Sequence, residues 1–229
     1  MSFQFKQFLI RQDKCAQKVS EVACIQGAWT TLPPSCKRVL DIGSGTGLLS
    51  LMLAQRFEVM IDAIEIDEET YHQGKENMQH SPFIHKVNPI LGDLKTYRFE
   101  TSYDFIITNP PFFENQLQTD NVKGNIARHS SKLTLLELIR KIDDLLIPNG
   151  QFSILFPFDR KGELEKACAA YSFYPMSYLL IKHSESHEPK VLLALFSRNL
   201  VSVQQAHFII KESGIYTGQM KQLTEAYYL

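Results

Sequence analysis

Apolar and polar positions alternate between two periods from about residue 37 to residue 197, and this alternation predicts strands and helices in turn. Short apolar runs typical of buried strands lie at residues 38–42, 59–66, 88–91, 103–108 and 151–156. Helical spacing is found at residues 48–56, 68–79, 134–147 and 159–171. The third of these helices is expected to start with a capping box at Thr134 and Glu137 and to be ended by Pro148-Asn149-Gly150. The pattern predicts an α/β fold, a Rossmann-like doubly wound sheet that is mostly parallel with right-handed crossovers.

The two ends of the chain modify this picture. Strands predicted at 176–183 and 190–196 are joined by a segment too short for a helical crossover, so an antiparallel strand is expected near one edge of the sheet. The tail is expected to add one strand at 207–211 and one helix at 220–228. We expect residues 1–35, with a hairpin and a helix from Val19 to Trp29, to form an extension packed on a main domain of residues 36–229.

The composition is that of an ordinary globular domain. Hydrophobic residues make up 44% and charged residues 21% of the 229 positions, which suits one domain with a sizeable core. A net charge of −1 predicts that any polyanionic partner meets a local basic patch. The four cysteines show no metal-ligand spacing, and no apolar run approaches the roughly 20 residues of a membrane span. These features predict a cytoplasmic protein, taken as a monomer, with reduced thiols and no metal ion.

A glycine-rich segment connects the first parallel strand to its helix. The candidate ligand-contacting residues in it are Asp41, Gly43, Ser44, Gly45 and Gly47. Glycines let the backbone approach a ligand closely, and the helix N-terminus that follows offers unpaired N–H groups. A dinucleotide site requires the spacing G-x-G-x-x-G, whereas this loop has G-x-G-x-G. The tighter loop favours a ligand that lacks a pyrophosphate.

Carboxylates lie at the end of the next strand and just after the one that follows it, at the same expected edge. Glu65, roughly 20 residues after the loop, is placed to accept hydrogen bonds from two ribose hydroxyls, with Ile66 beside it. The acids at 67–69 fit the start of a helix better. Asp93, in Gly92-Asp93-Leu94, either accepts from an adenine amino group together with Leu94 or serves only as a turn aspartate.

The segment Thr108-Asn109-Pro110-Pro111-Phe112-Phe113 ends a buried strand. The two prolines restrict the backbone and make the chain turn outward at the strand's carboxyl end, where ligands bind in open α/β sheets. The Asn109 side-chain oxygen and the Pro110 carbonyl are two acceptors suited to a planar group that carries an NH2, and Phe112 supplies a stacking ring. The alternative is an ordinary turn followed by core phenylalanines.

Basic residues are threaded among aromatics near the N-terminus. Lys6, Arg11 and Lys14 occur there, and Arg128 and Lys132 lie in and after a long polar loop, residues 114–131. Together with Phe113, these side chains are candidates for contact with a phosphate-bearing substrate. The alternative for each cation is a solvated surface position, with the aromatics covering the end of the sheet. Loops of this length are usually functional or mobile.

Together, the glycine loop, Glu65, Gly-Asp-Leu and Asn-Pro-Pro-Phe resemble the class I methyltransferases that use S-adenosyl-L-methionine. Asn-Pro-Pro-Phe resembles the branch that methylates adenine N6, guanine N2 or a glutamine amide. The chain ends resemble the tRNA adenine-N6 methyltransferases that modify valine tRNA beside the anticodon, at position 37. The segments that carry this closer likeness are Phe3 to Phe8, Gln12 to Val19, Gly27-Ala28-Trp29, Ala127-Arg128-His129 and Tyr227-Tyr228.

The resemblance implies S-adenosylmethionine as cofactor, tRNA as partner and Asn109, Pro110 and Phe112 as catalytic residues. Ser20-Glu21-Val22 stands where the family commonly has Gly-Thr-Asp, so a contact to the cofactor's methionine end is either lost or made by Glu21. Glutamine methylation of a protein such as a release factor, guanine N2 methylation and a non-catalytic cofactor-binding module are the alternatives. Phe112 favours a base over a glutamine, since tyrosine is usual there in the glutamine branch.

Overall fold

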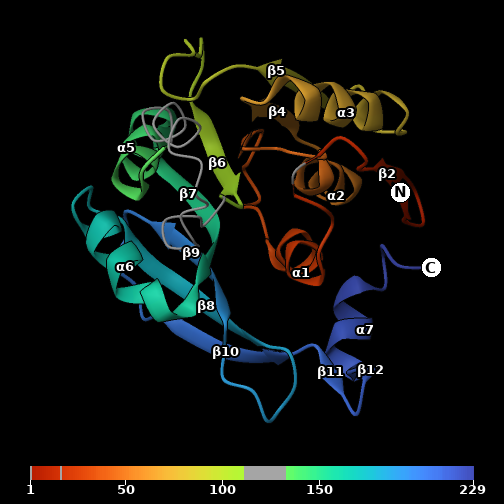
Figure 1. Cartoon of the computed structure of the whole chain (residues 1–229). Helices are drawn as coiled ribbons and strands as arrows, with labels where there is room; N and C mark the ends of the chain where they lie inside the picture. Colours follow the sequence, from red (N-terminus) through yellow and green to blue (C-terminus); the bar gives the residue numbers. More distant parts are fainter. Residues whose placement is uncertain (1, 16, 111–132) are drawn as a thin grey trace, which may run out of the picture.

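The computed structural model describes residues 2–15, 17–110 and 133–229, and its centre is an eight-stranded sheet (Figure 1). The sheet order is β10-β8-β9-β7-β6-β3-β4-β5. Only β9 runs antiparallel to its neighbours, so the predicted Rossmann-like, mostly parallel sheet with an antiparallel strand near one edge is confirmed. The strands are β3 (Arg38–Ile42), β4 (Met60–Glu65), β5 (Val87–Leu91), β6 (Tyr103–Thr108), β7 (Leu146–Pro157), β8 (Tyr174–Lys182), β9 (Val191–Ser197) and β10 (Gln204–Ile209).

Helices cover both faces of the sheet, as Figure 1 shows. They are α1 (Glu21–Trp29), α2 (Leu48–Arg56), α3 (Glu68–Gln79), α5 (Leu135–Leu145), α6 (Lys161–Ala169) and α7 (Gly218–Thr224). Alternate residues of the central strands enter different buried clusters, as in β3, where Val39 shares a cluster with α1 and α2 and Leu40 shares one with α5 and α6. This alternation is the period-two pattern of a strand buried on both faces. No helix among the described residues is long and apolar enough to cross a membrane.

The predicted end of the helix before β7 is wrong. Pro148-Asn149-Gly150 does not stop the helix, because α5 ends at Leu145 and β7 begins at Leu146. Tyr103 of β6 pairs with Leu146 and Phe105 pairs with Gln151, so residues 147–150, which include these three, form a bulge inside β7. A Cβ on Gly150 would lie 2.5 Å from the Leu146 Cγ, so glycine allows the bulge to fold back on that side chain.

The predicted tail is partly wrong. Between β10 and the last helix lies an antiparallel pair, β11 (Lys211–Glu212) and β12 (Ile215–Tyr216), where a single strand was expected over 207–211. Gly214, with φ at 80°, supplies the turn between them. The helix α7 starts earlier than expected, because the Thr217 hydroxyl accepts from the Met220 N–H and caps it.

The N-terminal segment forms a hairpin of β1 (Ser2–Gln4) and β2 (Leu9–Arg11), followed by α1. Phe5, Phe8 and Ile10 are buried in the same cluster as the residues of α2, so these aromatics serve as packing rather than as a stacking surface. The Lys6 N–H donates to the Tyr227 carbonyl at 2.8 Å and joins the two ends of the chain. All four cysteines are free and buried, as predicted.

Candidate active site

The register of the sheet brings the predicted motifs to one edge. Ile42 of β3 pairs with Ile64 of β4 and with Thr108 of β6. The residues that follow these strands, and those after β5, therefore leave the sheet side by side. We call this border, where β3, β4, β5 and β6 end, the carboxyl edge; ligands of open α/β sheets bind there.

The glycine loop crosses the carboxyl edge with its backbone exposed on one side. Gly43 and Gly45 have φ angles of 70° and 55°, which strongly favour glycine. A Cβ on Gly43 would meet no heavy atom within 4 Å, so the space beside the loop is open to a ligand. On the opposite side the loop is closely packed, since a Cβ on Gly74 of α3 would lie 2.4 Å from the Gly45 carbonyl oxygen. The glycine loop therefore packs against α3 on one side and leaves its other side open to a ligand.

Glu65 is oriented by backbone N–H groups. Its Oε2 accepts from the Gly45 N–H at 3.0 Å, and its Oε1 accepts from Ile66 at 2.9 Å and Asp67 at 3.0 Å. The residue is 8% exposed, and the neighbouring Ile66 is 57% exposed, so a fixed carboxylate lies next to an open apolar side chain. Asp67 caps α3 by accepting from the Thr70 N–H at 2.9 Å, as the helix-start interpretation predicted.

Asp41 is fully buried at the end of β3. Its Oδ2 accepts from the Ser50 N–H at 3.2 Å and from the Ser50 hydroxyl at 2.7 Å. Its Oδ1 has no hydrogen-bond partner among the described residues. Burial raises the pKa of Asp41 to about 7, although the bonds from Ser50 act in the opposite direction. One carboxylate oxygen under the glycine loop is therefore left without a protein donor.

The turn after β5 supports the interpretation of Asp93 as a turn aspartate and does not test a contact with an adenine amino group. Its Oδ1 accepts from the Lys95 N–H at 2.8 Å, and its carbonyl accepts from Thr96 and Tyr97. Asp93 therefore acts as a turn aspartate. Leu94 is buried in the core cluster on the α5 side.

Asn109 follows β6 directly beside the glycine loop. Thr108 before it is fully buried, and its hydroxyl donates to the Ile42 carbonyl at 3.0 Å. The Asn109 Oδ1 is buried and has no hydrogen-bond partner among the described residues. Pro110 is half-buried. Phe112 and Phe113 lie outside the described residues, together with the loop 114–131, Arg128 and Lys132.

Gln26 of α1 is a residue that the sequence interpretation missed. It is fully buried, and its Nε2 donates to the Thr108 carbonyl at 3.0 Å, immediately before Asn109. Its Oε1 lacks a partner among the described residues. The only signal in the sequence is a glutamine in an otherwise apolar helical stretch, which does not indicate its partner.

The predicted basic residues contact different elements. Lys6 donates to the Glu225 carbonyl at 2.7 Å at the end of the chain, whereas Arg11 pairs with Glu76 of α3 at 2.5 Å. Lys14 is exposed, and its N–H donates to the Gln73 side chain at 2.7 Å. Arg11 and Lys14 therefore lie along α3, while Lys6 contacts the C-terminal end of the chain.

Glu21 faces the antiparallel pair of β11 and β12. Its Oε1 accepts from the Lys211 ammonium and from the Tyr216 hydroxyl, each at 2.8 Å. Burial raises the pKa of Glu21, but the two donors outweigh it and the net pKa is lowered. Within the described residues no hydrogen bond joins Glu21 to the glycine loop, so the hypothesis that Glu21 replaces the missing Thr-Asp pair gains no support.

The residues at the carboxyl edge fit S-adenosylmethionine. The open side of the glycine loop admits a ligand that lacks a pyrophosphate, and Glu65 presents a fixed carboxylate next to the exposed Ile66. The unpartnered Asp41 Oδ1 adds one buried hydrogen-bond acceptor beneath the glycine loop. Among the described residues no cluster of His, Cys, Asp and Glu could hold a metal ion.

Comparison with known proteins agrees with this geometry. Residues 29–155 match the methyltransferase small domain family. A protein of Dyadobacter fermentans is 40% identical over 99% of this chain and 97% of its own length. A protein of Flavobacterium psychrophilum is 36% identical over 99% of both. Both relatives are named tRNA1(Val) (adenine(37)-N6)-methyltransferase.

Solved structures show the same fold. A predicted O-methyltransferase from Agrobacterium tumefaciens superposes with a TM-score of 0.68 at 16% identity, covering 89% of this chain and 95% of that one. The glycopeptide N-methyltransferase MtfA, complexed with S-adenosyl-L-methionine, superposes with a TM-score of 0.57 at 10% identity, covering 80% and 89%. The chain belongs to the methyltransferase small domain family and is an S-adenosylmethionine-dependent methyltransferase.

Proposed function

We propose that this enzyme methylates N6 of an adenine in tRNA, the adenosine at position 37 of valine tRNA. The names and the near full-length identity of the relatives support this substrate. The structural observation that carries the proposal is the buried Asn109 Oδ1, which has no partner among the described residues and lies beside the glycine loop. A buried acceptor without a donor costs about 1–3 kcal/mol, and an exocyclic amino group supplies the missing donor.

S-adenosylmethionine supplies a methyl group that its sulfonium already activates, so the protein mainly aligns the reacting atoms. The adenine amino nitrogen is a poor nucleophile because its lone pair is delocalised into the ring. The Asn109 Oδ1 and the Pro110 carbonyl accept its two N–H bonds and favour a pyramidal nitrogen. Both hydrogen bonds strengthen as positive charge develops on that nitrogen, which is the differential stabilisation that lowers a barrier. The N–C bond forms as the S–CH3 bond of the sulfonium breaks, and the cationic nitrogen then releases one proton to water, so no general base is needed in this scheme.

The cofactor side of the proposal assigns each predicted residue a contact. Glu65 binds the ribose hydroxyls, Ile66 and Leu94 flank the adenine, and Asp93 accepts from the adenine amino group. The glycine loop approaches the methionine portion. Its contact residues are Asp41, Gly43, Ser44, Gly45 and Gly47.

On the substrate side, Phe112 stacks on the target base and Phe113 lies next to it. The cations of the N-terminal segment and of the loop contact RNA phosphates. The Arg11–Glu76 pair does not oppose this role, because both side chains are largely exposed and such pairs contribute little to stability. We propose that residues 1–35 form an extension on the catalytic domain and that the enzyme acts in the cytoplasm as a monomer without a metal ion.

The test is incubation of the protein with labelled S-adenosylmethionine and total tRNA, followed by nucleoside analysis. The expected product is N6-methyladenosine in valine tRNA, which is absent with Asn109→Ala and with a transcript that carries guanosine at position 37. Methylated guanine N2, or label transferred only to a release-factor peptide, contradicts the proposal in favour of the corresponding alternative. Binding of S-adenosylmethionine without any transfer supports a non-catalytic module.

A further inference from the structure

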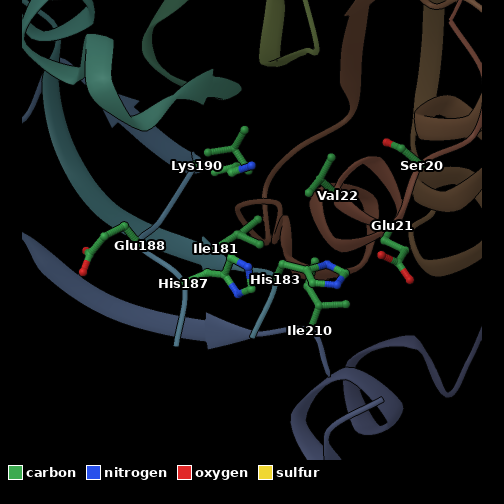
Figure 2. A pocket seen from close by; sticks show the side chains of 10 residues that line it. Ser20, Glu21, Val22, Ile181, His183, His187, Glu188, Lys190 and Ile210 are labelled. Atoms are coloured by element: carbon green, nitrogen blue, oxygen red, sulfur yellow. The ribbon is translucent and has the colours of Figure 1, made fainter. Parts of the chain in front are cut away.

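A second concave site lies beside the N-terminus of α1, as Figure 2 shows. This cavity of about 420 Å³ is bounded by α1, by the loop between β8 and β9, and by the residue that follows β10. Its floor is apolar, formed by Val22, Ile181 and Ile210. We call it the hairpin pocket.

The loop that borders the pocket carries imidazoles and a cation. The rings of His183 and His187 lie with centroids 5.9 Å apart and nearly perpendicular, at 87°. Both residues and Lys190 are exposed. Lys190 makes no ion pair with any described residue, whereas the Glu21 carboxylate at the other side is already paired with Lys211. Glu188 also lines the pocket and is exposed.

The loop has a fixed backbone. The Lys190 carbonyl accepts from the Phe158 N–H at 2.9 Å, just beyond β7, and the His183 carbonyl accepts from the Lys211 N–H at 2.9 Å. The side chains of the pocket are therefore presented by backbone that is hydrogen-bonded to the main sheet and to the tail. This preorganisation is what a binding site requires.

The pocket and the Asn109 turn lie on the same side of the molecule. The chain directions in the sheet place the end of β8 on the same border as the end of β6. The helix α1 links the two places, because Val22 lines the pocket and Gln26, four residues later, donates to the Thr108 carbonyl. Four residues correspond to about 6 Å along a helix, and positions i and i+4 share one face.

We propose that the hairpin pocket binds an unpaired nucleotide of the RNA substrate next to the target adenine. Its base contacts the apolar floor and the two imidazoles, and its phosphate lies at Lys190. Unpaired bases are recognised by stacking on aromatic rings, including histidine, and contacts to nucleotides that flank a flipped base set substrate choice. This inference rests on the proposed RNA methylation and adds a binding site for the nucleotide next to the target adenine.

The test compares pocket variants by their KM for valine tRNA and their affinity for it. Replacing both histidines by alanine is expected to raise KM and Kd about tenfold, with kcat at saturating tRNA and the Kd for S-adenosylmethionine unchanged. His183→Phe with His187→Phe keeps flat rings and is expected to restore most of the affinity. Lys190→Gln is expected to lower the slope of log K against log salt by roughly 0.7, the share of one phosphate on a single strand.

Matched controls lie at the opposite border of the sheet. His85 precedes β5 and Lys37 precedes β3, and both are exposed. His85→Ala and Lys37→Gln are expected to behave as wild type in every measurement.

The outcomes separate the two proposals. If wild-type protein methylates tRNA while the pocket variants keep wild-type KM and salt slope, the pocket proposal is overturned and the proposed function stands. If wild-type protein neither binds nor methylates tRNA, both proposals are wrong.

Discussion

The two halves of the carboxyl edge use their polar groups differently. In the half formed by β3 and β4, the Glu65 carboxylate accepts three backbone N–H groups, and the glycine loop is held against α3. In the half that begins at β6, the Asn109 Oδ1 and the nearby Gln26 Oε1 are buried without partners among the described residues. The first half leaves one buried acceptor unpaired, the Asp41 Oδ1, while its exposed side is formed by the satisfied Glu65 carboxylate. The second half leaves two acceptors unpaired, one of them in the turn at Asn109.

This difference fits the two ligands of a methyltransferase. A cofactor that is the same in every turnover is bound well by a carboxylate and a loop that are already oriented, because little entropy is lost on binding. An acceptor without a donor gains more when its donor becomes positive in the transition state than in the ground state. In the half that begins at β6, the rate of the reaction, rather than ligand binding, is therefore expected to depend on a single acceptor atom, the Asn109 Oδ1.

The largest expected effect comes from Asn109→Ala. Removing the acceptor is expected to lower kcat by roughly 10²–10³-fold, as removal of one polar group that stabilises transition-state charge does elsewhere. The Kd for S-adenosylmethionine, measured by titration calorimetry, should stay within about twofold. Asn149→Ala, an exposed asparagine in the β7 bulge, is the matched control and should keep full activity. Near-wild-type turnover of Asn109→Ala would refute its assigned role.

The second largest effect is expected from Glu65, in the half formed by β3 and β4. Glu65→Ala removes the acceptor of three backbone N–H groups and the proposed ribose contact. The Kd for S-adenosylmethionine is expected to rise about tenfold or more, since hydrogen bonds to a charged group contribute about 1.5–3 kcal/mol each. Glu69→Gln, an exposed acid on α3, is the control and should leave the Kd unchanged. An unchanged Kd for Glu65→Ala would remove Glu65 from the site.

Gln26→Leu tests whether Gln26 positions Asn109 through its hydrogen bond to the Thr108 carbonyl. Loss of the bond to the Thr108 carbonyl is expected to lower kcat about tenfold while the Kd for S-adenosylmethionine and the KM for tRNA stay the same. A lower kcat with unchanged KM and Kd indicates the loss of an interaction made only in the transition state. Circular dichroism at the assay temperature should show the variant fully folded, which excludes a smaller folded fraction as the cause. Gln55→Leu, which removes a similar bond from α2 to the Ala226 carbonyl, is the control. Equal losses in both variants would argue against a positioning role for Gln26.

The last prediction concerns the stability of the protein rather than its activity, as a pH dependence that arises from Asp41. Burial raises its pKa from a usual value of 3.8 to about 7, so the folded protein holds a proton that the unfolded chain releases between these values. This contribution to stability is fully present below pH 4 and is lost as the pH rises through 7, with a slope of at most about 1.4 kcal/mol per pH unit. Asp41→Asn should therefore show a smaller fall in Tm between pH 5 and pH 8. Asp144→Asn, an exposed carboxylate, should match wild type, and an unchanged fall in Asp41→Asn would contradict the assignment.

Elements with strong local signals were predicted with the observed bounds. The helices at 48–56 and 68–79 and the strand at 103–108 are examples, because the period that indicates each of them lies within the segment itself. The capping box at Thr134 and Glu137 is also confirmed. Pro148-Asn149-Gly150 misled the prediction because the same residues that end a helix also form a bulge, and only pairing of Leu146 with Tyr103 decides between them.

The sequence by itself determined the order of strands and helices, the glycine loop, the acid at the end of the next strand and the turn at Asn109, since each depends on neighbouring residues. Only the tertiary structure decided that Glu21 pairs with Lys211, that Gln26 supports Thr108, and that α1 and the β8–β9 loop enclose a pocket. These contacts join residues 82 or more positions apart. Their partners are set by how helices pack on the sheet, and no local pattern of residues encodes that packing.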